Sequence, residues 1–124
     1  MLSTIGQIAT RVTNLDRAIA FYRDTLGIPL LFQAPPGMAF FQCGPQMLML
    51  GLPERPDDDH AGSVLYFDVP DIESAHETLS ARGVEFVDRP HVVHRTPERD
   101  LWLNFFHDPD RNMLALMSWK PKAG

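Results

Sequence analysis

Val12-Thr-Asn-Leu15-Asp-Arg-Ala18 recurs 57 residues later in the chain as Val69-Pro-Asp-Ile72-Glu-Ser-Ala75. Each copy has an apolar strand end, a polar residue suited to capping a helix and an apolar helix start, all in the same register. The chain has 124 residues, which is enough for one hydrophobic core but too short for two independent domains with linkers. We therefore expect a single domain, 1–124, built from two copies of one module at about 1–56 and 61–120.

Each copy predicts a helix of about three turns. Asn14 and Asp71 are the expected N-caps, and Gly27 and Gly83 are the expected stops. Between these signals, apolar or aromatic residues follow helical spacing at Ala18, Phe21, Tyr22 and Leu26 in the first copy, and at Ile72, Ala75, His76 and Leu79 in the second.

Short runs of strand-forming residues, bounded by Pro, Gly and Asp, precede and follow each helix. They predict the order βαβββ twice and therefore an α+β fold. The acidic run Asp57–Asp59 between the copies is expected to be a solvated connector. The expected strands are 5–12, 29–33, 39–43, 46–50, 64–69, 84–87, 101–106 and 113–119.

Composition argues against several classes of function. The net charge is −5 and the sequence pI is about 5.4, without a run of Lys or Arg, so we expect no nucleic-acid partner. No apolar run is long enough to span a membrane, and the N-terminal residues do not resemble a signal peptide. Cys43 is the single cysteine and has no partner for an internal disulfide. We therefore expect a soluble cytoplasmic protein.

Strand parity separates the side chains of the expected sheets into two faces. One face is aliphatic and is expected to pack under the helices: Ile8, Val12, Leu48, Leu50, Leu65, Phe67, Val69, Leu114 and Leu116. The other face is mixed and carries four of the six methionines: Gln7, Ala9, Arg11, Met47, Met49, Val64, Tyr66, Met113, Ala115 and Met117. Because methionine adapts to irregular partners, the mixed face suits an organic ligand, although the same methionines could fill a second core.

The aromatic segment Leu101-Trp-Leu-Asn-Phe-Phe-His107 is a further source of ligand contacts. In a strand, half of its side chains face the cleft. We assign Trp102 as a flat apolar wall and Asn104 as a hydrogen-bonding amide beside it. Core packing is the alternative for Trp102, since a large amphipathic ring serves both roles.

Three motifs together resemble the vicinal oxygen chelate superfamily, which includes glyoxalase I, bleomycin resistance proteins and extradiol dioxygenases. They are Gly6-Gln-Ile-Ala-Thr-Arg-Val12, the Asn14 to Tyr22 helix start followed by Leu26-Gly27, and Asp108-Pro-Asp-Arg-Asn-Met-Leu-Ala-Leu116. The resemblance spans nearly the whole chain. It implies two βαβββ modules whose curved mixed sheets form a cup-shaped cleft, with the helices on the outer face, and it implies a homodimer.

In similar members that use a metal, the ligands are His, Gln or Glu side chains on the strands that line the cup. The matching positions here are Gln7, Met49, Val64 and Ala115, so only Gln7 offers a suitable donor atom. A divalent ion needs several oxygen or nitrogen ligands and compensating charge. We therefore expect no metal and no cofactor.

Other side chains give weaker signals for chemistry. His91 and His94 are flanked by Pro90 and Pro97, which favour an extended segment that points the two rings in different directions. His60 and His94 remain candidates for a base that reaches the cleft, and His76 is expected to be structural. Cys43 follows aromatic residues and is expected to be a small buried hydrophobe rather than a nucleophile.

Two functions remain open from the sequence. The first is a metal-independent protein that binds a small, partly apolar organic molecule through Gln7, Met47, Met49, Val64, Tyr66, Trp102, Asn104, Met113 and Ala115. The second is a lyase, isomerase or dioxygenase that uses a non-standard site, with Gln7 and a loop His or Asp in place of the usual ligands. No catalytic residue can be assigned from the sequence.

Overall fold

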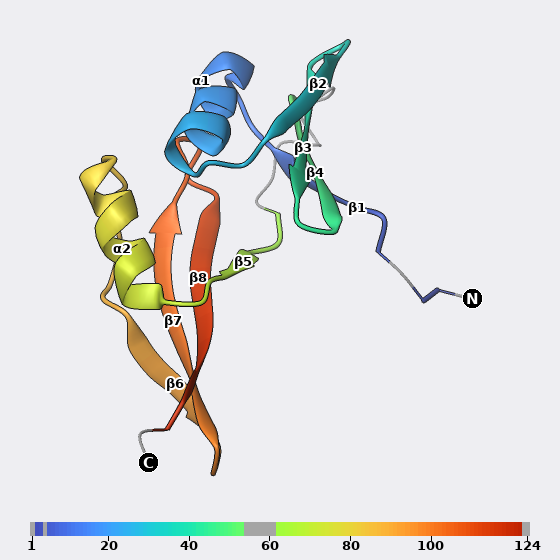
Figure 1. Ribbon diagram of the computed structural model, residues 1–124. Coiled ribbons are helices and arrows are strands. Elements are labelled where there is room, and N and C mark those ends of the chain that lie inside the picture. The colour runs from blue at the N-terminus through green and yellow to red at the C-terminus, as the bar shows by residue number, and fades with distance from the viewer. Residues whose placement is uncertain (1, 4, 54–61, 123–124) are drawn as a thin grey trace. The chain divides into compact units, whose positions relative to one another are not determined.

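The computed structural model describes residues 2–3, 5–53 and 62–122. It divides into two compact units, residues 1–63 and 64–124, and each is described by itself. Figure 1 shows the chain coloured from the N-terminus in blue to the C-terminus in red. His60 and the acidic run Asp57–Asp59 lie outside the described residues.

The first unit contains a helical segment and a four-stranded mixed sheet in the order β1-β4-β3-β2. Strand β1 runs parallel to β4, and the other two pairs are antiparallel. Helix α1 continues without a break into a π-helical segment, η1. The elements are β1 (Gln7–Arg11), α1 (Leu15–Ile19), η1 (Ala20–Thr25), β2 (Leu30–Ala34), β3 (Met38–Cys43) and β4 (Gln46–Gly51).

The second unit repeats this topology, with the sheet order β5-β8-β7-β6. Strand β5 is parallel to β8, and the remaining pairs are antiparallel. In Figure 1 the long orange and red strands β7 and β8 lie beside the yellow helix α2. The elements are β5 (Leu65–Asp68), α2 (Ile72–Ala81), β6 (His91–Arg95), β7 (Arg99–His107) and β8 (Met113–Pro121).

The α+β class and the double βαβββ order are therefore confirmed. Both sheets are open, since the outer strands of each do not pair with one another within the described ranges. None of the helices in the described part of the chain has the length and apolar character needed to cross a bilayer.

The repeated cap signals act as the sequence predicts. The Asn14 side-chain oxygen accepts a hydrogen bond from the Arg17 N–H at 3.0 Å, and Asp71 accepts bonds from the Glu73 and Ser74 N–H groups at 3.2 Å. Gly27 (φ 75°) and Gly83 (φ 94°) follow the two helices in the left-handed region, which a glycine adopts without a steric penalty.

Replacing Asp71 with alanine is expected to lower the free energy of unfolding by about 1 kcal/mol, because two N–H groups of the first helical turn lose their acceptor. Urea denaturation followed by circular dichroism measures the loss. The variant Asp71→Asn keeps an acceptor oxygen and serves as the matched control. Equal losses in the two variants would contradict the capping role.

The helix-facing side of each sheet forms the core of its unit. Val12, Leu48, Leu50, Leu114 and Leu116 are buried, as the aliphatic face predicts, whereas Ile8, Leu65, Phe67 and Val69 are half-buried. The largest buried rings on these sides are Tyr22 and Phe41 in the first unit and Phe106 in the second.

The strand predicted at 84–87 was wrong. This segment makes only one isolated bridge to the sheet, between Phe86 and Phe106, and the strand that follows α2 is instead β6. The Phe86 ring lies 4.2 Å from the ring of His76 and 5.2 Å from that of Phe106. Because Phe86 packs against both α2 and β7, the segment is held as a connection and does not extend along the sheet.

Candidate functional site

In the first unit, an apolar and thioether surface covers the sheet face opposite α1. Backbone pairing places Gln7 beside Met47, and Met49 between Ala9 and Phe40. The Gln7 side-chain amide donates to the Met49 sulfur, with the nitrogen 4.0 Å from Sδ. Gln7, Met47 and Met49 thus lie together on one face, as strand parity predicts.

Two aromatic rings that the sequence did not predict extend this surface. Phe32 on β2 stacks on Phe40 on β3, with ring centroids 4.6 Å apart and an interplanar angle of 22°. Phe32 is 50% exposed although it is a large apolar residue. The signal was present in Ala39-Phe40-Phe41, where alternation sends Phe41 to the buried side and Phe40 to the opposite one. We define Gln7, Met47, Met49, Phe40 and Phe32 as the first aromatic–thioether face.

The second unit has a corresponding face opposite α2. Ala115 on β8 pairs with Tyr66 on β5 and with Phe105 on β7. The rings of Tyr66 and Phe105 meet edge to face, with centroids 6.1 Å apart. Ala115 is fully buried while Tyr66 is 49% exposed, so the rings and not the alanine methyl group are accessible.

Methionines flank these rings on the same side of the second sheet. Met113 and Met117 are half-buried and lie two residues on either side of Ala115. Val64 is 36% exposed and precedes β5 rather than belonging to it. We define Tyr66, Phe105, Met113 and Met117 as the second aromatic–thioether face.

The two faces are related by the internal repeat. Ala9, Met49 and Phe40 are neighbours across the first sheet, and Tyr66, Ala115 and Phe105 are neighbours across the second. On the central strand, the large Met49 of the first sheet is replaced by the small Ala115 in the second. On the strand parallel to it, the small Ala9 of the first sheet is replaced by the large Tyr66 in the second. Each face therefore has one large side chain besides its phenylalanine: Met49 on β4 in the first sheet and Tyr66 on β5 in the second.

The predicted placement of Trp102 and Asn104 on this second face was wrong. Register pairs Trp102 with Ser118 and Asn104 with Leu116, which puts both side chains on the side of α2. The Lys120 ammonium lies 4.5 Å from the Trp102 ring centroid and also pairs with Glu73 on α2. The side chains of β7 that share the face of Tyr66 are instead Arg99, Leu101, Leu103, Phe105 and His107.

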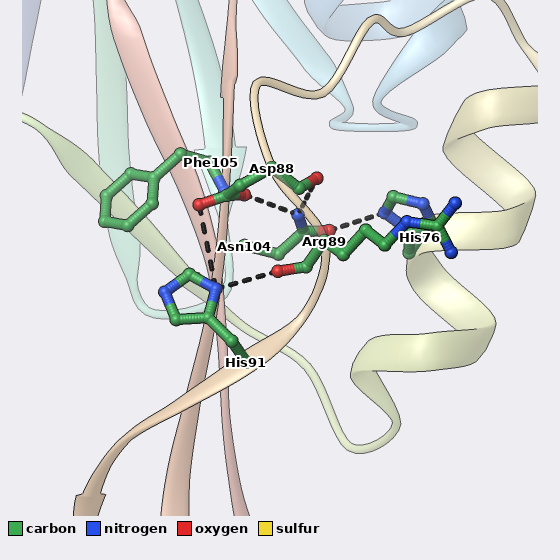
Figure 2. Close-up of polar contacts among 6 residues, drawn as sticks. All are labelled: His76, Asp88, Arg89, His91, Asn104 and Phe105. Atoms are coloured by element: carbon green, nitrogen blue, oxygen red, sulfur yellow. Dashed lines mark hydrogen bonds and ion pairs between the residues drawn. The ribbon is translucent and has the colours of Figure 1, made fainter.

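Asn104 has a structural role, which Figure 2 shows. It is fully buried, and its side-chain nitrogen donates to the backbone and side-chain oxygens of Asp88 at 3.0 and 2.9 Å. Its oxygen lies 2.6 Å from His76 Nδ1. Since this oxygen can only accept, Nδ1 carries the proton of that hydrogen bond. Asp88 also accepts from the Phe105 N–H at 2.8 Å, so the network joins α2, the connection and β7. The structural role expected for His76 is confirmed.

A β-bulge in β6 places the His91 and His94 side chains on the same face of the sheet, in contrast to the expectation from the sequence. The register shift between Val92 and His94 pairs His91 with Leu103 and His94 with Leu101, so both histidines lie on the face that carries Phe105. His91 Nδ1 lies 2.7 Å from the Arg89 carbonyl oxygen and 3.7 Å from the Asp88 carboxylate. The His94 ring meets Trp119 edge-on, at 6.3 Å between centroids. The prediction that the two rings point in different directions was wrong.

The donor atoms do not fit a divalent metal. Of the four positions that match the metal ligands of similar proteins, Gln7 offers an amide, Met49 a thioether, and Val64 and Ala115 no donor. No group of three or more His, Cys, Asp or Glu side chains in the described ranges gathers in a metal-binding arrangement. A divalent cation would lose its hydration without enough ligands to replace it.

Cys43 also lacks the surroundings of a nucleophile. Its side chain is half-buried at the end of β3, and burial raises the pKa of the thiol above its ordinary value. The neutral thiol therefore persists to higher pH than in an exposed cysteine, and the thiolate is the form that attacks or binds metals.

A comparison with known protein families identifies the superfamily to which the chain belongs. The sequence model of the Glyoxalase/Bleomycin resistance protein/Dioxygenase superfamily matches residues 4–116. The chain belongs to this superfamily. The match includes both modules, in agreement with the resemblance carried by the first-helix and Asp108-Pro-Asp motifs.

Solved structures of similar proteins have the same fold. A superfamily member from Sphaerobacter thermophilus DSM 20745 is 27% identical, with a TM-score of 0.77 over 94% of this chain and 98% of the other. Lactoylglutathione lyase from Agrobacterium tumefaciens is 26% identical, with a TM-score of 0.74 over 94% and 93%. TnmS3, an antibiotic binding protein from Streptomyces sp. CB03234, is 23% identical, with a TM-score of 0.77 over 96% and 98%.

Proposed function

We propose that this superfamily member binds a flat, partly apolar organic molecule without the help of a divalent metal. The observation that carries the proposal is the solvent exposure of aromatic rings on sheet faces that point away from the helices. Phe32 and Tyr66 are each about half exposed and are accompanied by Phe40, Phe105 and four methionines. Large apolar side chains that gather at an exposed face are typical of a ligand or partner surface.

The chemistry of these faces favours planar ligands. Aromatic rings offer stacking and edge-to-face contacts, and thioethers adapt to ligands of irregular outline. Among the described residues, the Gln7 amide on the first face donates only to a weak sulfur acceptor, so a ligand oxygen would be a better partner for it. Polar groups of this kind orient a ligand within a mainly apolar site.

Two of the structural relatives illustrate the alternatives. TnmS3 binds an antibiotic, but its identity to this chain is low and the likeness extends to the fold alone. The lactoylglutathione lyase is an enzyme, and the positions matching the usual metal ligands of the superfamily provide one amide here. The proposal therefore rests on the residues of this chain rather than on either relative.

A screen with and without metals tests the proposal. Protein purified without chelators is assayed for zinc, nickel, iron and manganese, and planar aromatic compounds are then tested by thermal shift in EDTA or in each divalent ion. Stabilisation by an organic compound in EDTA supports the proposal, because a ligand that binds only the folded state raises apparent stability. Stoichiometric bound metal, or ligand binding that requires an added ion, would overturn it.

Tyr66→Ala and Phe40→Ala variants locate the binding face. Loss of the relevant ring is expected to weaken binding of a hit compound about tenfold, as measured by titration calorimetry, because a stacking surface is lost. Val87→Ala is the matched control, since Val87 is 55% exposed but lies in the connection after α2. A ligand whose affinity is unchanged in both ring variants does not bind at these faces.

The homodimer, the absence of a nucleic-acid partner and the cytoplasmic location stay predictions of the sequence. Light scattering coupled to gel filtration measures the first directly.

A further inference from the structure

We infer that a hollow at one end of the second sheet is a binding site for a small zwitterion, a molecule with both an ammonium and a carboxylate group. The hollow has a volume of about 340 Å³ and is lined by Asp68, Val69, Pro70, Arg99 and Trp119. None of these lining residues belongs to the two aromatic–thioether faces, so the inference goes beyond the proposed function and names a separate site.

The lining residues come from three strands and from the segment between β5 and α2, and register puts the polar ones on one face. Asp68 on β5 pairs with Met117 on β8, which places its carboxylate on the side of the second aromatic–thioether face. Arg99 begins β7 opposite Pro121, two residues beyond Trp119 on β8. Side chains two residues apart on a strand share a face, so Arg99 and Trp119 point to this side as well.

Arg99 is held in a defined position. Its guanidinium carbon lies 4.2 Å from the centroid of the Trp119 ring, which is cation–π geometry. Its backbone is closed into a turn by the bond between the Thr96 N–H and the Arg99 carbonyl oxygen at 2.9 Å. A stacked guanidinium keeps the N–H groups at its edge free for a planar acceptor, and a carboxylate is the acceptor that matches them.

Unlike the basic residues near it, Arg99 forms no ion pair with any other described residue. Arg95 and Lys122 both pair with Asp100, at 3.3 and 3.4 Å, and Lys120 pairs with Glu73 at 3.3 Å. Within the described ranges, neither Arg99 nor Asp68 takes part in an ion pair. A positive and a negative group therefore line the same hollow without neutralising one another.

A zwitterion fits this arrangement better than a single ion does. Its carboxylate would meet Arg99 and its ammonium would meet Asp68, whereas a simple anion or cation would leave one lining charge facing a like charge. Val69, Pro70 and the Trp119 ring offer an apolar wall for the rest of the molecule. The volume is at the small end of the range for ligand pockets, which suits a molecule the size of an amino acid.

Three related compounds test the inference without any mutation. Phenylalanine carries both charges, phenylalanine amide lacks the carboxylate, and N-acetylphenylalanine lacks the ammonium. We expect phenylalanine to bind about tenfold more tightly than either analogue, because each analogue loses one charge-assisted contact. Titrations followed by NMR use the Trp119 indole N–H as the reporter. The Trp102 indole, which lies on the α2 side of the same sheet, is the internal control and is expected not to shift.

Variants then assign each charge to its partner. Arg99→Gln is expected to remove the preference for phenylalanine over its amide but to keep the preference over the N-acetyl compound, and Asp68→Asn is expected to do the reverse. Arg95→Gln is the matched control because Arg95 already pairs with Asp100.

The outcomes separate the two proposals. Equal affinities for the three compounds, or shifts that do not include Trp119, overturn the zwitterion site even if planar aromatic compounds bind elsewhere. If neither the three compounds nor the aromatic library binds, both the zwitterion site and the proposed function fail.

Discussion

Phe106→Ala is expected to destabilise the protein by about 3–5 kcal/mol, which is the cost of removing a large ring from a packed core. Phe106 is fully buried on the α2 side of β7, and its ring centroid lies 5.2 Å from that of Phe86. Chemical denaturation at several temperatures measures the free energy of unfolding.

The neighbouring residue provides the matched control. Phe105 has the same side chain but lies on the opposite face of β7 and is only half-buried, so Phe105→Ala is expected to cost much less stability. Phe105→Ala is instead expected to weaken binding of a ligand that uses the second aromatic–thioether face. If Phe105→Ala proved the more destabilising of the two, the assignment of the two faces would be reversed.

Asn104→Ala is expected to lower the free energy of unfolding by about 2–4 kcal/mol. The substitution empties a fully buried position, removes the Asn104 donor from half-buried Asp88, which keeps its bond from the Phe105 N–H, and leaves half-buried His76 without its acceptor. Unpaired buried polar groups cost more than the hydrogen bond itself contributes.

His76→Phe distinguishes the network from simple packing. A phenyl ring can keep the contact with Phe86 but cannot donate to Asn104, so this variant is expected to lose about 1–2 kcal/mol. Gln33→Ala, at an exposed amide on β2, is expected to stay close to the wild-type stability. An Asn104→Ala protein as stable as the Gln33→Ala control would show that the network contributes nothing.

The local signals in the sequence were sufficient for most of the architecture. The repeated Asn14 and Asp71 caps and the glycines at 27 and 83 placed both helices, since caps and stops act through neighbouring backbone groups. The first face was also predictable, because β1 and β4 are regular strands whose alternation carries Gln7, Met47 and Met49 to the same side.

The alternation of side chains in the sequence did not show which residues of β7 lie on the second aromatic–thioether face. In β7 every residue from Leu101 to Phe106 is apolar or aromatic except Asn104, so the sequence has no polar alternation to show which set is buried. The pairing with β8 decides that Phe105, and not Asn104, shares a face with Tyr66. Because side chains alternate with a period of two, an error of one residue moves the whole set to the other face.

By itself the sequence determined the repeat, the two capped helices and the βαβββ order. Tertiary structure alone decided that Trp102 and Asn104 face α2, that the bulge in β6 turns His91 and His94 to one side, and that Arg99 and Asp68 line a common hollow. The physical reason is the sequence separation of the interacting groups. The backbone groups of caps and turns find their hydrogen-bond partners within a few residues, whereas register and bulges are set by hydrogen bonds between strands that are distant in the chain.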